Sequence, residues 1–329
     1  MNRNSMGARM LGLVAVVAVV TVAGCGGGGS SSSGSGGDKT VTIGFAQVGS
    51  ESGWRTANTQ SIKSVLTKEN GFTLKFADAQ QKPENQIQSI RSFIAQKVDV
   101  IAFSPVVTTG WDTVLEEAKA AKIPVILTDR AVDVKDDSLY ASFIGSDFVD
   151  EGKRAGVYVS TTFGTAPISV VELQGTTGSA PAIDRKKGFA EAIAANPNIK
   201  VVASQTGNFT RSEGKQVMEG LLQSQPKIDV LFAHNDDMAL GAIEAIEAAG
   251  KKPGQDIKIV SIDGVKDGMQ ALTDGKINYI VECNPLLGPD LATLAKKVAD
   301  GGTVEKRIVT KDEAFDQAAA KVALPSRKY

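Results

Sequence analysis

Short apolar runs alternate with longer amphipathic stretches from residue 41 onward, and this alternation most constrains how the chain can fold. An apolar run without polar alternation is typical of a strand buried on both faces, whereas apolar residues at helical spacing indicate a helix that packs on one side. The strand–helix unit repeats about every 25 residues, which predicts parallel sheets covered by helices.

The alternation falls into two runs of similar size. The first predicts strands at 41–46, 73–78, 98–103, 123–128 and 140–145, with helices at 54–70, 83–94 and 109–121. The second predicts strands at 168–174, 199–205, 230–233 and 257–262, with helices at 182–195, 212–225 and 236–249. We therefore expect an α/β protein of two similar lobes, and a cleft between such lobes suits a small ligand.

The first residues have the pattern of an export signal. Arg3 and Arg9 precede a short apolar run that ends in Val22-Ala23-Gly24-Cys25. This ending resembles the lipobox of bacterial lipoproteins, in which the cysteine is lipidated, although a plain signal peptide with an incidental cysteine is the alternative. Only Gly and Ser follow up to residue 37, as in a flexible tether. We expect a lipoprotein signal peptide at 1–24 and a lipidated Cys25 with its tether at 25–37. The protein would then be exported and anchored on the outer face of the cytoplasmic membrane or in the periplasm.

Composition excludes several classes of protein. Lys and Arg total 36 against 37 Asp and Glu, so no basic face for nucleic acid is expected. A single histidine, His234, argues against a histidine-based catalytic triad or a multi-histidine metal site. Two distant cysteines offer no disulfide framework. We expect no metal and no cofactor, and a monomer.

Polar and aromatic residues follow the predicted strands where each strand ends. Carboxyl ends of parallel strands form the edge at which open α/β folds bind ligands. Asp accepts hydrogen bonds from sugar hydroxyls, Arg donates through a planar fork, Asn does both, and an aromatic ring packs on the apolar face of a sugar. The candidate residues of this kind are Ser52, Trp54, Arg55, Ser104, Asp129, Arg130, Arg185, Phe209, Asn235 and Asp263.

Several of these positions also have a structural explanation. Asp129-Arg130 could form a solvated turn, Trp54 could be a core residue, and Asp263-Gly264 could be a turn. Asp236 is a good N-cap for the helix that follows it. His234 and Trp111 are expected to be packing residues.

The motifs together resemble the periplasmic sugar-binding proteins of the ribose- and galactose-binding type, which are substrate-binding components of ABC importers. The resemblance covers about residues 41 to 316. The motifs that carry it are Gly44-Phe45-Ala46-Gln47 with Trp54-Arg55, Pro124-Val125-Ile126-Leu127-Thr128-Asp129-Arg130, Asp184-Arg185-Lys186-Lys187-Gly188-Phe189, Ala233-His234-Asn235-Asp236-Asp237-Met238-Ala239-Leu240-Gly241-Ala242 and Ser261-Ile262-Asp263-Gly264. Gly49-Ser50-Glu51-Ser52-Gly53-Trp54-Arg55 and Val171-Glu172-Leu173-Gln174-Gly175-Thr176 are similar to the galactofuranose-binding branch.

The resemblance implies two Rossmann-like lobes joined by a hinge of three crossovers, near Ser146, Asn284 and Glu313, that closes around one sugar. The lobes would comprise residues 38–146 with 284–313, and 147–283 with 314–329. It further implies that Trp54 stacks on the sugar and that Phe209 packs on its ring. The hydroxyls would be held from one lobe by Asp129 and Arg130, and from the other by Arg185, Asn235 and Asp263.

Three positions depart from the pattern of ribose-binding relatives. Arg55 stands where a second aromatic residue is common, Ser104 where Asn is common, and Cys283 where an amide is common. These changes replace one stacking face with a polar fork and favour a sugar with a hydroxyl layout different from ribose. Like Arg55 and Ser104, Cys283 is counted among the candidate ligand-binding residues, and its thiol is expected to pack rather than react.

The predicted function is the substrate-binding component of an ABC sugar importer, which carries a monosaccharide such as galactofuranose to a permease with its ATPase. A sensor that presents a bound sugar to a membrane receptor is the alternative. A glycosidase built on Asp129 and Asp263 is not expected, because neither acid stands in an apolar setting that would raise its pKa. A sugar-responsive repressor is not expected either, because an export signal occupies the place of a DNA-binding segment.

Overall fold

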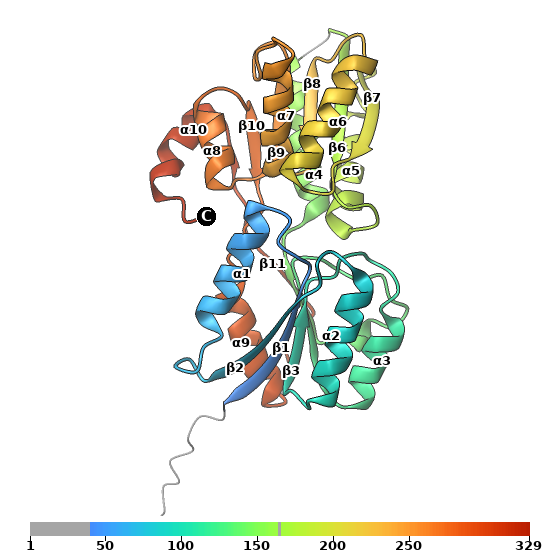
Figure 1. Ribbon diagram of the computed structural model, residues 1–329, viewed down its shortest axis with the longest axis vertical. Coiled ribbons are helices and arrows are strands. Elements are labelled where there is room, and N and C mark those ends of the chain that lie inside the picture. The colour runs from blue at the N-terminus through green and yellow to red at the C-terminus, as the bar shows by residue number, and fades with distance from the viewer. Residues whose placement is uncertain (1–39, 164–165) are drawn as a thin grey trace, which may run out of the picture. The chain divides into compact units, whose positions relative to one another are not determined.

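The computed structural model describes residues 40–163 and 166–329 (Figure 1). The expected signal peptide, Cys25 and the Gly/Ser tether lie outside the described residues. No helix in the described part of the chain is long and apolar enough to cross a membrane.

The first sheet has six parallel strands in the order β11-β5-β4-β3-β1-β2. Figure 1 shows α1 and α9 on one side of this sheet and α2 and α3 on the other. The strands are β1 (Val41–Gln47), β2 (Phe72–Asp78), β3 (Val100–Phe103), β4 (Val125–Thr128), β5 (Ser142–Gly145) and β11 (Arg307–Val309). The helices are α1 (Gly53–Val65), α2 (Pro83–Ala95), α3 (Asp112–Ala120), the 3₁₀ turn η1 (Asp137–Leu139) and α9 (Gly288–Ala299).

The second sheet has the order β12-β10-β9-β8-β6-β7, and only β12 runs antiparallel to its neighbour. Its strands are β6 (Ile168–Gln174), β7 (Ile199–Thr206), β8 (Val230–Ala233), β9 (Lys258–Asp263), β10 (Tyr279–Glu282) and β12 (Ala314–Phe315). The helices around it are α4 (Phe148–Phe163), α5 (Ala180–Ile193), α6 (Arg211–Ser224), α7 (Asp236–Ala248), α8 (Lys266–Thr273), α10 (Gln317–Ala323) and the 3₁₀ turn η2 (Leu324–Ser326).

The chain passes between the two sheets three times. It crosses after β5, again after β10, and a third time between β11 and β12. These places coincide with the crossovers expected near Ser146, Asn284 and Glu313. The fold class expected from the sequence, two α/β lobes with mostly parallel sheets and a three-crossover hinge, is confirmed.

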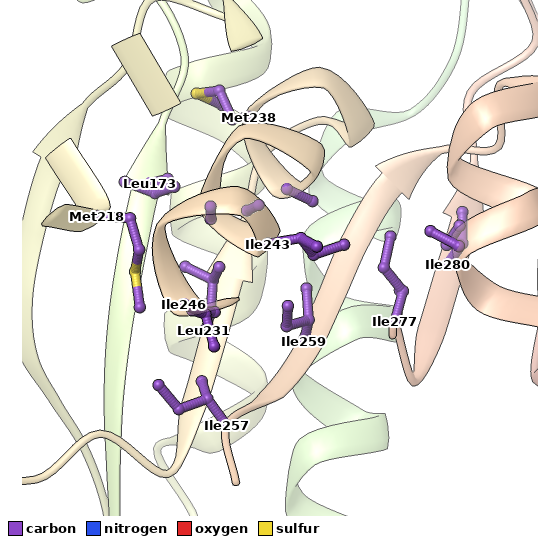
Figure 2. Packing of buried hydrophobic residues seen from close by; sticks show 14 of the residues in the cluster. Leu173, Met218, Leu231, Met238, Ile243, Ile246, Ile257, Ile259, Ile277 and Ile280 are labelled. Atoms are coloured by element: carbon purple, nitrogen blue, oxygen red, sulfur yellow. The ribbon is translucent and has the colours of Figure 1, made fainter. Parts of the chain in front are cut away.

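A dense apolar core fixes the position of α7 in the second lobe. Figure 2 shows Met238, Ile243 and Ile246 of this helix among side chains from β6, β8, β9 and β10. All three helix residues are buried, and buried side chains of this size leave a helix little freedom to shift. The N-terminus of α7, which carries Asn235 and two aspartates, is therefore held rigidly at the edge of the sheet.

The predicted end of the first helix is wrong. The sequence favoured a helix that continues to Asn70 and is closed by Gly71, but α1 ends at Val65. The side-chain amide of Asn70 donates to the carbonyl oxygen of Val65 at 2.8 Å. Asn70 thus satisfies a carbonyl at the helix end instead of extending the helix, and Gly71, at φ 82°, serves the turn into β2.

Candidate functional site

Residues from both lobes and from the hinge line one polar cleft. The cleft has a free volume of about 20 Å³, which is room for about one water molecule. The lining residues are Glu51, Ser52, Trp54, Arg55, Asp129, Arg130, Pro181, Arg185, Phe209, Asn235, Asp263 and Cys283.

The structure brings together every candidate from the sequence except Ser104, which lies behind the cleft. Ser104 donates to Asp129 Oδ2 at 3.0 Å and accepts from Arg55 Nη1 at 3.4 Å. It therefore orients two lining residues rather than reaching the cleft. Glu51 and Pro181 line the cleft but were not among the candidates, although Glu51 stands within a loop that the sequence had singled out.

The N-terminus of α1 supplies the first group of polar side chains. Ser52 caps this helix by accepting from the amide of Arg55 at 3.1 Å. The guanidinium of Arg55 lies between Glu51 and Asp129, with Nε to Glu51 Oε1 at 3.0 Å and Nη2 to Asp129 Oδ2 at 2.7 Å. Arg55 is 2% exposed. Burial opposes its charge, but the carboxylates of Asp129 and Glu51 outweigh that effect and raise its pKa above the ordinary value.

Arg130 extends this group toward the second lobe. Its Nη1 donates to the carbonyl oxygen of Val106 at 3.2 Å, and its guanidinium carbon lies 5.2 Å from the centre of the Phe209 ring. Burial and the neighbouring charge of Arg55 lower its pKa to about 10. Among the described residues, its Nε has no hydrogen-bond partner. Arg130 thus offers an unused donor to a ligand in the cleft.

Arg185, from α5, is the corresponding base of the second lobe. Its Nε pairs with Glu151 Oε2 at 2.7 Å, its Nη1 donates to the carbonyl oxygen of His234 at 2.6 Å, and its Nη2 lies 3.8 Å from Asp263 Oδ1. Burial works against its charge, but the nearby acids prevail and raise its pKa. His234 is fully buried, as expected of a packing residue. Its backbone nevertheless orients Arg185, a role that the sequence does not reveal.

Asp263 contradicts the expectation that no candidate acid has a raised pKa. Its side chain is 3% exposed, and one carboxylate oxygen, Oδ2, finds no partner within the described protein. Burial raises the pKa of Asp263 well above the ordinary value. The charge of Arg185 lowers this pKa, but the charge of Asp236 offsets part of that lowering. The sequence could not show this, because the acids near Asp263, such as Asp236 and Glu151, come from helices distant in the chain.

Asn235 lines the cleft, but its amide already has protein partners. Its Oδ1 caps α7 by accepting from the amide of Met238 at 3.0 Å, and its Nδ2 donates to the carbonyl oxygen of Phe209 at 3.1 Å. The expectation that Asp236 is the N-cap is therefore wrong, because Asn235 holds that position. The bond to Phe209 places the aromatic ring at the cleft, at a backbone φ of 64°.

Trp54 connects the cleft with the hinge. Its indole Nε1 donates to the carbonyl oxygen of Cys283 at 2.6 Å, and its ring lies under the guanidinium of Arg55 at 4.7 Å. The thiol of Cys283 lies 3.5 Å from the hydroxyl of Ser146, on another crossover. Trp54 is therefore both packed and part of the lining, and the two explanations considered for it do not exclude each other.

Two backbone donors of the first lobe bond directly to the second lobe. The amide of Gly53, at the start of α1, donates to Asp237 Oδ2 at 2.7 Å, and the amide of Thr108 donates to the carbonyl oxygen of Gly178 at 2.9 Å. A carboxylate at a helix N-terminus is also favoured by the helix dipole. The lobes therefore meet through protein contacts of their own beside the cleft.

The lining carries as many acids as arginines: Glu51, Asp129 and Asp263 face Arg55, Arg130 and Arg185. Such a lining suits a ligand without charge that has several hydroxyls, since a hydroxyl bonds to both kinds of group. Two aromatic rings add apolar faces. The fold and the site together are those of a two-lobed protein whose cleft suits a small neutral polyol.

The chain belongs to the family of the periplasmic binding protein domain, whose model matches residues 43–303. It is 52% identical to the galactofuranose-binding protein YtfQ of Escherichia coli strain K12, over 88% of this chain and 92% of YtfQ. The family is one of non-catalytic, exported binding proteins of the periplasm. The chain's membership in it agrees with the family expected from the motifs.

Two solved structures are similar over 88% of this chain. One is a protein from Mycobacterium smegmatis in complex with β-D-fucofuranose, with 68% identity, a TM-score of 0.86 and 95% of that chain covered. The other is the periplasmic binding component of the arabinose ABC transporter from Shewanella sp. ANA-3, bound to α- and β-L-arabinofuranose. It has 49% identity, a TM-score of 0.84 and 96% of that chain covered.

The two tryptophans of the chain allow a spectroscopic test of the lining. Trp54 lies at the cleft, whereas Trp111 is fully buried in the core of the first lobe. We expect ligand binding to change the intrinsic fluorescence through Trp54, so the change should disappear in Trp54→Phe and persist in Trp111→Phe. A fluorescence change that survives in Trp54→Phe would remove this residue from the site.

Proposed function

We propose that the chain is the substrate-binding component of an ABC sugar importer. It binds one monosaccharide in its furanose form, closes the two lobes around it and delivers it to a membrane permease. The balanced set of buried acids and arginines from both lobes carries this proposal. Galactofuranose, fucofuranose and arabinofuranose are named for the three relatives above, which supports a furanose ligand.

Unpartnered buried atoms mark where the hydroxyls would bind. Within the described residues, Glu51 Oε2 and Asp263 Oδ2 lack donors, and Arg130 Nε lacks an acceptor. Buried polar atoms without partners are costly, so a ligand that supplies them gains affinity. We assign the two carboxylates to accept sugar hydroxyls and Arg130 to donate to one. Trp54 and Phe209 pack on the apolar faces of the ring.

Other lining residues hold these groups in place. Each guanidinium nitrogen of Arg55 has a partner in Glu51, Ser104 or Asp129. We therefore assign Arg55 and Ser104 to orient Asp129, whose carboxylate we assign to accept a sugar hydroxyl. Arg185 orients Asp263 in the same way. Asn235 fixes Phe209, and Cys283 receives Trp54. Ser52 caps α1 and sets the direction of Arg55.

The remaining features of the proposal concern anchoring and assembly. We assign residues 38–146 with 284–313 to one lobe and 147–283 with 314–329 to the other. Lipidation at Cys25 would anchor this monomer to a membrane, and the Gly/Ser tether would let it reach the permease and its ATPase. The relatives named above are binding proteins and a transporter component, and they do not favour the alternative of a signal sensor.

A thermal-shift screen of residues 38–329 tests the function. The panel comprises D-galactose, D-fucose and L-arabinose, which contain furanose forms at equilibrium, together with D-ribose, D-glucose, and galactonate as an anionic control. A ligand at 100 times its Kd stabilises by about 2.7 kcal/mol, which shifts Tm measurably. We expect a shift with a furanose-forming neutral sugar and none with galactonate. Absence of a shift with every neutral sugar would refute the ligand class.

A further inference from the structure

The peptide group between Gly264 and Val265, one residue after Asp263, is held from both sides by side chains outside the cleft. The amides of Gly264 and Val265 donate to Asp236 Oδ2 at 2.8 and 2.9 Å. On the other side, the carbonyl oxygen of Gly264 accepts from Arg327 Nε at 2.6 Å. Asp236 belongs to α7, whereas Arg327 belongs to the last segment of the chain, after η2.

The backbone at this point needs such support. Asp263 has φ 125° and Gly264 has φ 78°, and the first of these values lies in a region that residues with a side chain rarely adopt. A strained conformation persists only where the surroundings hold it. A Cβ at position 264 would collide with the guanidinium of Arg327. The glycine therefore lets Arg327 rest directly on the peptide group.

Arg327 is itself held in place before any ligand binds. Its Nη1 pairs with Glu282 Oε1 at 2.7 Å, and the hydroxyl of Tyr329 donates to the same oxygen at 2.6 Å. Its guanidinium lies 4.4 Å from the centre of the Tyr329 ring and 5.2 Å from that of Phe315. Arg327 is therefore a rigid part of the lobe, and both side chains of its ion pair are 9% exposed.

The same contacts reach the hinge. Glu282 directly precedes Cys283, which lines the cleft and receives Trp54. Its other oxygen, Oε2, accepts from the amide of Glu313 at 2.8 Å, beside the third crossover. Arg327 thus links the loop that follows Asp263 with two of the three crossovers, without lining the cleft itself.

We propose that Arg327 is a positioning residue of the binding site, which acts by fixing the Gly264 peptide and thereby the Asp263 carboxylate. The inference rests on the proposed function, since it concerns affinity for the same sugar. Arg327 acts only through Asp263, so its removal should cost affinity in proportion to what Asp263 contributes.

The test compares Arg327→Ala with Lys328→Ala, which removes the same charge from an exposed neighbour. Titrations of D-fucose and L-arabinose give the affinity, and thermal unfolding is followed in parallel. We expect Arg327→Ala to raise Kd at least tenfold and Lys328→Ala to leave it within twofold. A lower Tm with an unchanged Kd would show a merely structural role and overturn the proposal.

Two further measurements test whether Arg327 acts on sugar affinity through Asp263. In an Asp263→Asn background, Arg327→Ala should raise Kd by less than threefold, whereas an undiminished tenfold effect would exclude action through Asp263. Hydrogen exchange of the sugar-free protein should show faster exchange of the Gly264 and Val265 amides in Arg327→Ala. That measurement needs no ligand, so unchanged exchange would refute the positioning role even if no sugar bound to the wild type.

Discussion

Asp129→Asn is expected to weaken sugar binding at least 100-fold and to lower the free energy of unfolding by about 3 kcal/mol. The substitution keeps the shape of the side chain but removes the charge that faces Arg55 at 2.7 Å. Loss of one partner from a buried ion pair costs about 3–5 kcal/mol, and in binding sites about 2–5 kcal/mol. Calorimetric titration and denaturant unfolding measure the two effects.

Asp133→Asn is the matched control for this variant. Asp133 is exposed and follows the same strand four positions later, so its substitution should change neither quantity. Binding by Asp129→Asn within threefold of the wild type would show that the Arg55–Asp129 pair is not part of the recognition of the sugar. A stable but non-binding variant would show that the ion pair serves recognition alone.

Glu151→Gln is expected to remove much of the pH dependence of stability. Glu151 and Asp263 are two buried acids beside one base, Arg185, and Glu151 Oε1 lacks a partner in the described part of the chain. Burial, partly offset by Arg185, raises the pKa of Glu151 from 4.5 to about 7. The folded state thus holds a proton that the unfolded state releases, and the stabilisation is complete below pH 4.5 and lost as pH rises through 7.

The size of this effect follows from the rise in the pKa of Glu151. A rise from 4.5 to about 7 corresponds to about 3 kcal/mol of free energy of unfolding. Between pH 5 and pH 8, Glu151→Gln should therefore gain about 2.5 kcal/mol of stability relative to the wild type, because part of the effect is already lost at pH 5. Denaturant unfolding at both pH values measures the difference. Glu191→Gln, exposed on α5, should show no such gain, and a parallel pH profile for Glu151→Gln and the wild type would contradict the shift.

The strand ends could be predicted because the residues that mark each of them are neighbours in the sequence. An apolar run that stops at Asp129 or Asp263 marks the edge of a parallel sheet, and the topology then gathers these ends at one place. The middle strands were located well for the same reason, since β6 and β8 are buried along most of their length. Almost all candidate residues therefore line the cleft.

The partners of those residues could not be predicted. Glu151 meets Arg185 across 34 positions, and Arg327 meets Gly264 across 63. Such pairs depend on how α4 packs on α5 and on where the chain returns after η2, and no local pattern records either arrangement. The ends of helices were missed where a side chain such as Asn70 replaced the expected glycine cap.

The two bonds between the lobes, from Gly53 to Asp237 and from Thr108 to Gly178, form without any contribution from a ligand. Each bond is worth about 1 kcal/mol, or more where a carboxylate takes part. Together they shift the ratio of closed to open molecules at least about 30-fold toward the closed form. The apparent affinity for a sugar held by the closed form rises with the fraction of molecules in that form and levels off as the fraction approaches one. The same two bonds would therefore both tighten sugar binding and slow the release of the sugar to the permease. Transport would be fastest when the contact between the lobes has intermediate strength.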